Sequence, residues 1–314
     1  MLSWAADAVL ASAVLAAAGV TIAARETFVA TVGFVITGLL LGLVWIRLDS
    51  PDIALIEVAI GGGASGVLVL LVAPRLSQSP RGAEAERPGR ALVALDGMLC
   101  LLLALLLAQA VLTLPVVAPG LSGQVRAAMQ GMGFANPVTV VLMTFRAIDT
   151  LLETIVLVFA LLAIWALSRD DAWPAAPGPR RIGAPGNALD LFARVLPPLG
   201  VLVGIHLTWA GADAPGGKFQ GGTLLGAMWA LLWFAGHARP PALSSRRLRV
   251  ALLAGPVLFL LVGLAGLPLA GAFLAYPPGW TKALVLAIEF TLTLSVAAAV
   301  AMMLAGPALG ARAR

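Results

Sequence analysis

An arginine and two carboxylates interrupt a long apolar stretch near the middle of the chain. The sequence FRAIDTLLET, residues 145–154, has Val-Val-Leu-Met before it and Ile-Val-Leu-Val-Phe-Ala after it. On a helix, Arg146, Asp149 and Glu153 occupy positions i, i+3 and i+7 and form one polar stripe, with Thr150 beside it. Because an ionised group at the centre of a bilayer costs at least about 2.5–3.5 kcal/mol, the stripe should face protein or water.

The sequence leaves two interpretations of this stripe. In the first, Arg146 and Asp149 form a static ion pair that fixes the packing of the helix. In the second, the stripe belongs to an ion path. Glu153 favours the second interpretation, because a further carboxylate exceeds what one arginine must neutralise and can change its protonation state.

Three more carboxylates lie within apolar runs. Glu57 stands in SPDIALIEVAIGGGASG, and a lone carboxylate there has few structural reasons to exist in lipid. Glu289 stands in VLAIEFTLTLSV, where Thr291 and Thr293 also suggest a polar packing face with a static hydrogen bond. For Asp96, in ALVALDGMLC, a place in the ion path and a place at the membrane interface are both open.

A stretch rich in glycine and proline follows later, HLTWAGADAPGGKFQGG at residues 206–222. Its composition ends one helix and begins the next. An ordinary turn is one interpretation; the alternative is that its amides and polar side chains line a hydrated cavity. A lone histidine is more often a core residue than a proton carrier. The candidate residues of this stretch are His206, Asp213, Pro215, Gly216, Gly217, Lys218 and Gln220.

Composition indicates an all-α polytopic membrane protein. Of 314 residues, 61% are apolar and 11% charged, and the mean hydropathy is +1.00. Apolar stretches of 18 or more residues recur along the whole chain. About nine transmembrane helices are expected, with a short interfacial helix within 120–133. Their predicted ranges are 4–24, 28–47, 53–74, 91–115, 137–168, 190–209, 221–238, 248–274 and 281–306.

The distribution of basic residues predicts the topology of these helices. The odd-numbered loops and the C-terminal end contain 14 Lys and Arg residues, and the even-numbered loops contain four. Positive residues favour the cytoplasm, so the N-terminus should lie outside and the C-terminus in the cytoplasm. The basic residues fall between apolar runs, which argues against a nucleic-acid-binding face. With a single cysteine, no disulfide within the chain is possible.

Two linkers divide the chain into three predicted modules. The segments 77–90 and 169–188 are rich in Pro, Gly and charge, as flexible connectors are. The modules are residues 1–76, 91–168 and 189–314. Small-residue pairs suit close helix contacts and predict assembly with other membrane subunits. The pairs behind this prediction are Gly38 with Gly42 and Gly200 with Gly204. Gly62 and Gly66 are also spaced for close helix contact.

Several of these stretches together resemble one family. NPVTVVLMTFRAIDTLLETIVLVFALLAIWAL is similar to the C-terminal region of the A subunit of Mrp-type cation/proton antiporters. DSPDIALIEVAIGGG resembles the three-helix module of membrane-bound hydrogenases. GADAPGGKFQGG and IEFTLTLSV resemble the Mrp B subunit, whose loop has the pattern Pro-Gly-Gly-x-Phe-x-x-Gly. The chain thus resembles a fusion of pieces that are usually separate.

The chain departs from the family at four positions. Gly61 stands where Mrp A subunits usually have glutamate, and Glu57 follows the hydrogenase-like pattern instead. In the B-type loop, Ala212 replaces a usual histidine, and Lys218 replaces a small residue. Glu289 stands where aspartate is common.

The resemblance implies a subunit of a multisubunit ion-translocating complex related to respiratory complex I, with Glu57, Arg146, Asp149 and Glu153 in its polar axis. We therefore predict a carboxylate-lined path for H⁺ or Na⁺ in a bacterial or archaeal cytoplasmic membrane. The expected partners are large antiporter-like membrane subunits, and no cofactor is expected. A structural scaffold that joins partner subunits is the alternative. A self-sufficient carrier is disfavoured because clear paired repeats with broken helices are missing.

Overall fold

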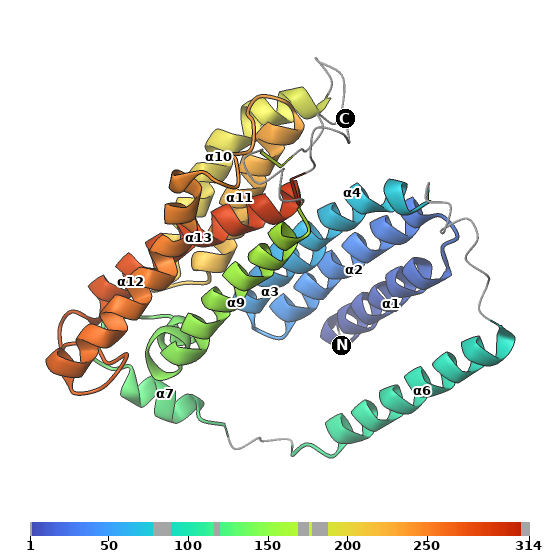
Figure 1. Ribbon diagram of the computed structural model, residues 1–314. Coiled ribbons are helices and arrows are strands. Elements are labelled where there is room, and N and C mark those ends of the chain that lie inside the picture. Colours follow the sequence, from blue (N-terminus) through green and yellow to red (C-terminus); the bar gives the residue numbers. More distant parts are fainter. Residues whose placement is uncertain (1, 78–88, 116–119, 169–175, 178–187, 309–314) are drawn as a thin grey trace.

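The computed structural model describes residues 2–77, 89–115, 120–168, 176–177 and 188–308 (Figure 1). Within these residues the chain is helical and has no strand, which confirms the predicted all-α membrane fold. The elements in chain order are α1 (Leu2–Ala23), α2 (Thr27–Arg47), α3 (Pro51–Ile56), η1 (Glu57–Ala64), α4 (Ser65–Ser77), α6 (Arg90–Leu112), α7 (Ser122–Ala128), α8 (Pro137–Val140), η2 (Val141–Phe145), α9 (Ala147–Ala166), α10 (Ala188–Ala210), α11 (Lys218–Phe234), α12 (Arg246–Ala270) and α13 (Thr281–Ala305).

Eight helical segments in the described part of the chain are long and apolar enough to cross a membrane. The remaining predicted span, the seventh at 221–238, corresponds to α11, which has 17 residues. At a rise of about 1.5 Å per residue, α11 is about 26 Å long, slightly less than a bilayer core of about 30 Å. The short helix α7 lies within the predicted range 120–133, and its place at the membrane interface stays a prediction. Both linkers lie largely outside the described residues.

Two predicted spans are not regular α-helices. The third contains the π-helical segment η1, and the fifth contains η2. In η2 the amide of Arg146 donates to the carbonyl of Val141, five residues back, at 2.8 Å. Arg146 itself leaves the helical conformation, with φ −126° and ψ 33°. The single continuous helix predicted over 137–168 is therefore wrong, and Arg146 precedes α9 instead of lying on it.

Side chains from elsewhere stabilise the π-helical segment η2. The Thr150 hydroxyl donates to the carbonyl of Leu142 at 2.7 Å, and the Tyr276 hydroxyl donates to that of Met143 at 2.8 Å. An unpaired buried carbonyl would be costly, so these bonds help to hold the interruption in place. Because Tyr276 is distant in sequence, hydrophobic periodicity could not predict it.

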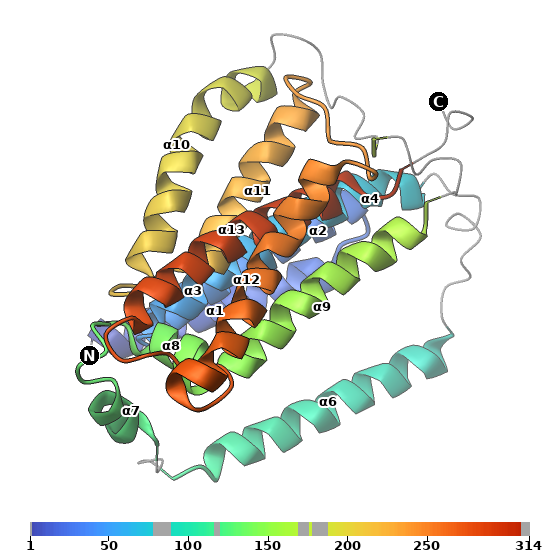
Figure 2. The same ribbon diagram turned by 60° about the vertical axis from the view of Figure 1, so that its left-hand side comes forward.

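The C-terminal helices form the densest part of the molecule. Helix α13 packs against α11 and α12, α10 packs against α11, and α9 lies along α12 and α13 (Figures 1 and 2). Helix α2 packs against α1, α3, η1 and α4, and this N-terminal group meets α11 through α3 and η1. Helix α6 stands apart in both views, and none of its side chains is buried.

The small-residue pairs are used inside the chain. A Cβ atom on Gly38 would lie 2.8 Å from Cα of Gly62, and one on Gly204 would lie 3.3 Å from the carbonyl of Gly221. Only glycine permits the first of these backbone approaches without a shift, and the second is tighter than most contacts that a Cβ makes. The expectation that they indicate partner subunits is therefore unsupported, because their contacts are already made within this chain.

One end of the bundle contains the even-numbered loops, which are those before α3, α8, α11 and α13, together with their flanking residues. The loop before α11 is bonded to the start of α3, to the segment before α8 and to Lys282 at the start of α13. A chain that crosses a membrane repeatedly must place every second loop on the same side, as this arrangement does. Which end faces the outside stays a prediction from the basic residues.

Candidate functional site

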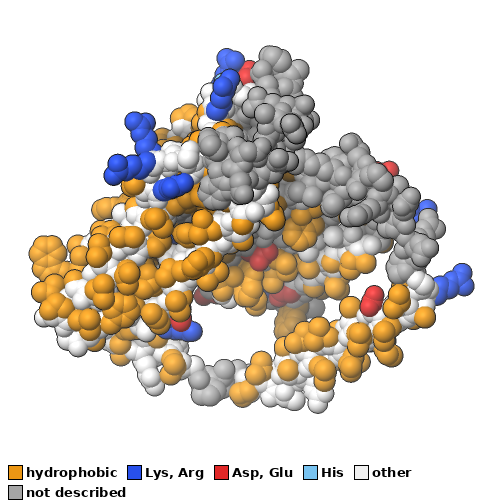
Figure 3. All heavy atoms as spheres, viewed as in Figure 1, with side chains coloured by type: hydrophobic (Ala, Val, Ile, Leu, Met, Phe, Trp, Pro, Cys, Tyr) orange, Lys and Arg blue, Asp and Glu red, His pale blue; other side chains and the backbone are white. Residues whose placement is uncertain are grey.

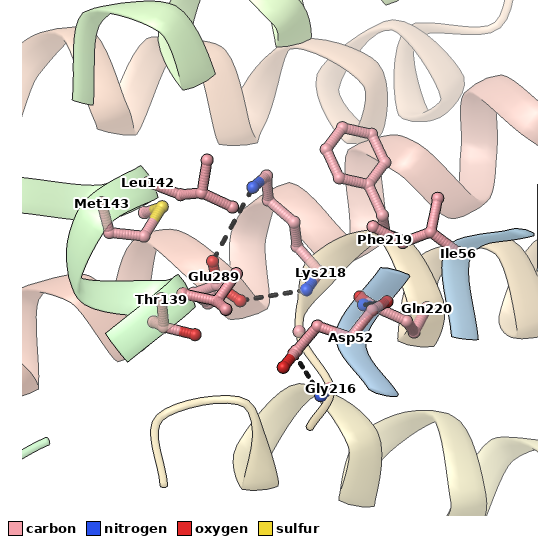
Figure 4. Close-up of a pocket in the computed structure, with 12 residues that line it drawn as sticks. Asp52, Ile56, Thr139, Leu142, Met143, Gly216, Lys218, Phe219, Gln220 and Glu289 are labelled. Carbon is pink, nitrogen blue, oxygen red and sulfur yellow. Dashed lines mark hydrogen bonds and ion pairs between the residues drawn. The ribbon is translucent and has the colours of Figure 1, made fainter. Parts of the chain in front are cut away.

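Lys218 and Glu289 form a buried ion pair in the C-terminal helices. Their side chains are about 5% and 6% exposed, and Nζ of Lys218 lies 3.9 Å from Oε1 of Glu289 (Figure 4). The backbone amide of Lys218 also donates to Oε2 of Glu289 at 2.9 Å. Lys218 is the first residue of α11 and Glu289 lies within α13, so the pair joins two packed helices. Glu289 is thus a partner of a helix N-terminus as well as of an ammonium group.

Gly217 allows the carboxylate to approach this helix end. Its φ of +132° is a conformation that other residues rarely adopt, and a Cβ there would lie 3.3 Å from Oε2 of Glu289. The amide of Gly217 donates to the carbonyl of Leu207 at 2.9 Å, which ties the loop to the end of α10. The Pro-Gly-Gly sequence therefore brings the start of α11 against Glu289.

Asp52 connects the N-terminal helices to the same loop. Its Oδ1 accepts hydrogen bonds from Nδ2 of Asn136 at 3.2 Å and from the amide of Gly216 at 3.1 Å. Nε2 of Gln220 donates to the Asp52 carbonyl at 3.4 Å. Asp52, Asn136 and Gln220 are all buried, so this is an internal junction of three distant segments.

Sequence reasoning missed both Asp52 and Asn136. Asp52 follows Pro51 in the first turn of α3, which is an ordinary place for an acidic residue. Asn136 precedes Pro137 and caps α8 by accepting a hydrogen bond from the amide of Val138. Both residues therefore have a local explanation. The one available signal was the free amide nitrogen of Asn136, which a cap of this kind leaves unused.

An ion pair at the surface closes the same end of the bundle. Nζ of Lys282 lies 2.8 Å from both carboxylate oxygens of Asp213 and 2.6 Å from the carbonyl of Gly133. The hydrogen bond from Lys282 holds the pKa of Asp213 below its usual value. In the loop before α13, burial and the nearby Glu289 raise the pKa of Tyr276, so its hydroxyl stays protonated as a donor.

A small cavity of about 40 Å³ lies between these segments (Figure 4). A water molecule needs about 10–15 Å³ measured in this way, so there is room for about two or three. Its boundary carries both signs of charge and is otherwise largely apolar. The lining residues are Asp52, Ile56, Val138, Thr139, Leu142, Met143, Gly216, Gly217, Lys218, Phe219, Gln220 and Glu289.

The stripe of Arg146, Asp149 and Glu153 lies outside this cavity. Nε of Arg146 is 2.6 Å from Oδ2 of Asp149, and these side chains are 70% and 47% exposed. Glu153 is also exposed, on the face of α9. Lys218 and Glu153 are nonetheless close enough to interact electrostatically. Glu153 is thus near the buried pair. On the face seen in Figure 3, apolar side chains predominate and charged ones are scattered.

Glu57 lies where η1 begins and is partly buried. Its carboxylate folds over Gly61, because a Cβ on Gly61 would collide with Oε1 and Cδ of Glu57. A π-helical turn often marks a functional position. Here the Glu57 carboxylate occupies the space that the absent side chain of Gly61 leaves free. Segment η1 as a whole contacts α11, the helix that follows the glycine-rich loop.

Three further predicted site residues also do not line the cavity. Asp96 is exposed on α6, His206 is exposed on α10, and Pro215 is exposed in the loop. No group of three potential metal ligands occurs among the described residues. The arrangement is instead suited to moving a proton or a small cation between neighbouring charged groups.

Two regions of the chain match models of known families. Residues 12–78 match the MbhD family of MBH proteins, and residues 188–306 match a domain related to the MnhB subunit of Na⁺/H⁺ antiporter. No curated protein matches the chain.

Two solved structures are similar to the chain. A chain of the Mrp complex from Dietzia sp. DQ12-45-1b is 25% identical, with a TM-score of 0.75 over 96% of this chain and 34% of that chain. The present chain thus spans about a third of the length of that relative. The archaeal membrane-bound sulfane sulfur reductase is 21% identical, with a TM-score of 0.52 over 68% of this chain and 98% of that chain. This second match shows a shared fold.

Proposed function

Since this chain joins a region of the MbhD type to one of the MnhB type, we propose that it is a membrane subunit of an Mrp-like, complex I-related ion-translocating complex. It provides a carboxylate-lined path for H⁺ or Na⁺ in a bacterial or archaeal cytoplasmic membrane. The observation that carries this proposal is the buried pair of Lys218 and Glu289 beside a small cavity. Buried charge in a membrane protein is costly and commonly marks an ion path.

The location of the pair supports a path through the three proposed modules, residues 1–76, 91–168 and 189–314. Asp52 belongs to the first module, Thr139 to the second, and both line the cavity with Lys218 and Glu289. Glu153 extends the charged groups from Lys218 toward the surface of α9. A route made of groups from all three modules would explain why one chain contains them.

The exposed stripe supports assembly with other membrane subunits. Exposure to lipid would cost at least about 2.5–3.5 kcal/mol for an ionised group at mid-membrane. Arg146 and Asp149 reduce this cost by pairing, but Glu153 adds a further exposed carboxylate. We propose that antiporter-like partner subunits cover this face of α9 and continue the path.

The contacts of Asp52 favour a second function, that of a scaffold. Its carboxylate accepts hydrogen bonds from Asn136 and Gly216, and these hold three segments together without any change of charge. If Lys218 and Glu289 act in the same way, the chain joins partner subunits and conducts nothing. The two functions differ in what happens when a charge is removed but the shape is kept.

The substitution Glu289→Gln tests the proposal. It preserves the size of the side chain and removes its negative charge. We expect the complex to assemble and ion flux in inverted membrane vesicles to fall at least about tenfold, as when a proton-transferring group is lost. Flux is divided by the amount of complex on a native gel. Glu26→Gln makes the same chemical change at an exposed position before α2 and should leave flux unchanged. Normal flux in Glu289→Gln would favour the scaffold.

A further inference from the structure

The ammonium group of Lys218 is held in an unusual way for a buried lysine. Its side chain is about 5% exposed, and its nearest charged partner, Oε1 of Glu289, is 3.9 Å away. That distance exceeds the 2.7–3.2 Å or so of a hydrogen bond between nitrogen and oxygen. The other contact is with the face of the Phe219 ring, at 4.7 Å from its centre. Three donor hydrogens therefore have an aromatic face and a distant carboxylate as neighbours.

The cavity supplies what the ammonium group lacks. Lys218 and Glu289 both line it, and Figure 4 shows the lysine side chain extending beside the glutamate. A polar contact longer than about 3.5 Å commonly contains a bridging water, and the cavity has room for about two or three. Water there would accept from Lys218 and donate to Glu289. The two side chains and the water would then form one continuous hydrogen-bonded unit.

We propose that Lys218 occupies the position that a metal cation would take beside Glu289, so that this site passes H⁺ and excludes Na⁺. This inference rests on the proposed function and names its ion. A hard cation needs several oxygen ligands around it. Here a fixed ammonium already neutralises Glu289, and it would repel a second cation a few ångströms away through a medium of low dielectric constant.

Proton transfer within the pair balances charge without another ion. A proton moves from Nζ of Lys218 through water to Oε1 of Glu289, which leaves a neutral amine and a neutral carboxylic acid. The reverse transfer restores the ion pair, so the site changes its proton positions while its total charge stays constant. Burial penalises the charged form of each group. It therefore reduces the free-energy difference between the ion pair and the pair of neutral amine and neutral carboxylic acid.

Other ionisable groups face the pair from each element packed around it. Asp52 contributes from α3, Glu153 from α9 and Tyr276 from the loop before α13. Oδ1 of Asp52 is occupied by two hydrogen bonds, and the Tyr276 hydroxyl donates to a carbonyl. Glu153 is the exposed carboxylate on the Lys218 side, so it is the group that would deliver or receive the proton.

The first test compares sodium binding in variants of the assembled complex. Lys218→Ala removes the competing ammonium and leaves Glu289 with an open cavity. We expect NaCl, compared with choline chloride at equal ionic strength, to raise the melting temperature of Lys218→Ala by about 3 °C more than that of the wild type. The gain should disappear in the double variant Lys218→Ala/Glu289→Gln. Lys282→Ala is the matched control, because it frees a carboxylate that water already screens, and it should show no gain.

The second test needs only the wild-type complex and Glu289→Gln. We expect wild-type H⁺ flux to be the same in choline and sodium media, and any stabilisation by sodium to be equal in the two proteins. Sodium stabilisation of the wild type that is lost in Glu289→Gln would overturn the proposal, as would an absent gain in a folded Lys218→Ala variant. If Lys218→Ala fails to assemble, this second test decides. Full flux in Glu289→Gln would refute the proposed function, while the sodium comparison would still report on the chemistry of the cavity.

Discussion

Helices α13 and α6 are similar in length and hydropathy and opposite in environment. Each is long and apolar and has one carboxylate, Glu289 in α13 and Asp96 in α6. Over the most apolar part of each helix, 56% of residues are buried in α13 and none in α6. Glu289 is paired with Lys218 inside the chain, whereas Asp96 lies on an exposed surface.

The two helices differ in the size of their side chains. Helix α13 contains the buried run Ala297–Ala298–Ala299, and a Cβ on Gly226 of α11 would lie 2.8 Å from the carbonyl of Ala297, whereas α6 is rich in leucine. In a membrane, association depends on close packing rather than on hydrophobicity, since lipid is as apolar as leucine. Hydropathy therefore identifies both spans, and the packing surface decides which one is buried by its own chain.

The largest effect should follow from filling a backbone contact in the packed region. A Cβ on residue 38 would lie 2.8 Å from Cα of Gly62. The larger side chain of Gly38→Leu should therefore separate α2 from η1. We expect a loss of at least about 1–3 kcal/mol, seen as a marked fall in protein that stays monodisperse in mild detergent. Gly97→Leu on α6 is the control, because nothing in the chain lies within 4 Å of that position. Equal losses in the two variants would contradict the described packing.

A smaller effect is expected at the exposed stripe of α9. Glu153→Gln should leave assembly intact and lower ion flux at least about tenfold, if Glu153 passes protons to Lys218.

Asp149→Asn should lower flux and also reduce the yield of complex, because Arg146 loses its partner at 2.6 Å. Glu57→Gln should impair flux alone. Vesicle flux normalised to assembled complex distinguishes these outcomes, and a scaffold would give normal flux in Glu153→Gln and Glu57→Gln.

The smallest effect concerns the ion pair of Asp213 with Lys282. Because the pair lowers the pKa of Asp213, its stabilisation is present above the ordinary aspartate value of about 3.9 and is lost as pH falls through the lowered value. Both groups are partly exposed, so the contribution is less than about 1 kcal/mol. Asp213→Asn should thus lower the melting temperature slightly at pH 7 and hardly at acidic pH. The same difference at both pH values would exclude this pair as its cause.

Part of the candidate site was predictable from residue types. Lys218 and Glu289 were recognised because charge within apolar sequence is conspicuous, and the glycine-rich stretch between α10 and α11 predicted an interrupted backbone. Their pairing was not predicted, since 71 residues separate them. Asp52 was missed for a related reason, because an acidic residue at a helix start needs no distant partner to explain it.

The sequence by itself determined the class of the protein. Its apolar runs specify membrane helices, its basic residues predict their orientation, and its motifs indicate Mrp-type and hydrogenase-like modules. Only the tertiary structure decided that Glu289 meets Lys218 at a cavity, that Arg146 precedes α9 after a π-helical turn, and that Glu153 stays exposed. The physical reason is that hydropathy and local spacing depend on near neighbours. Charge pairing and π-helical interruptions depend instead on groups that folding brings together from distant segments.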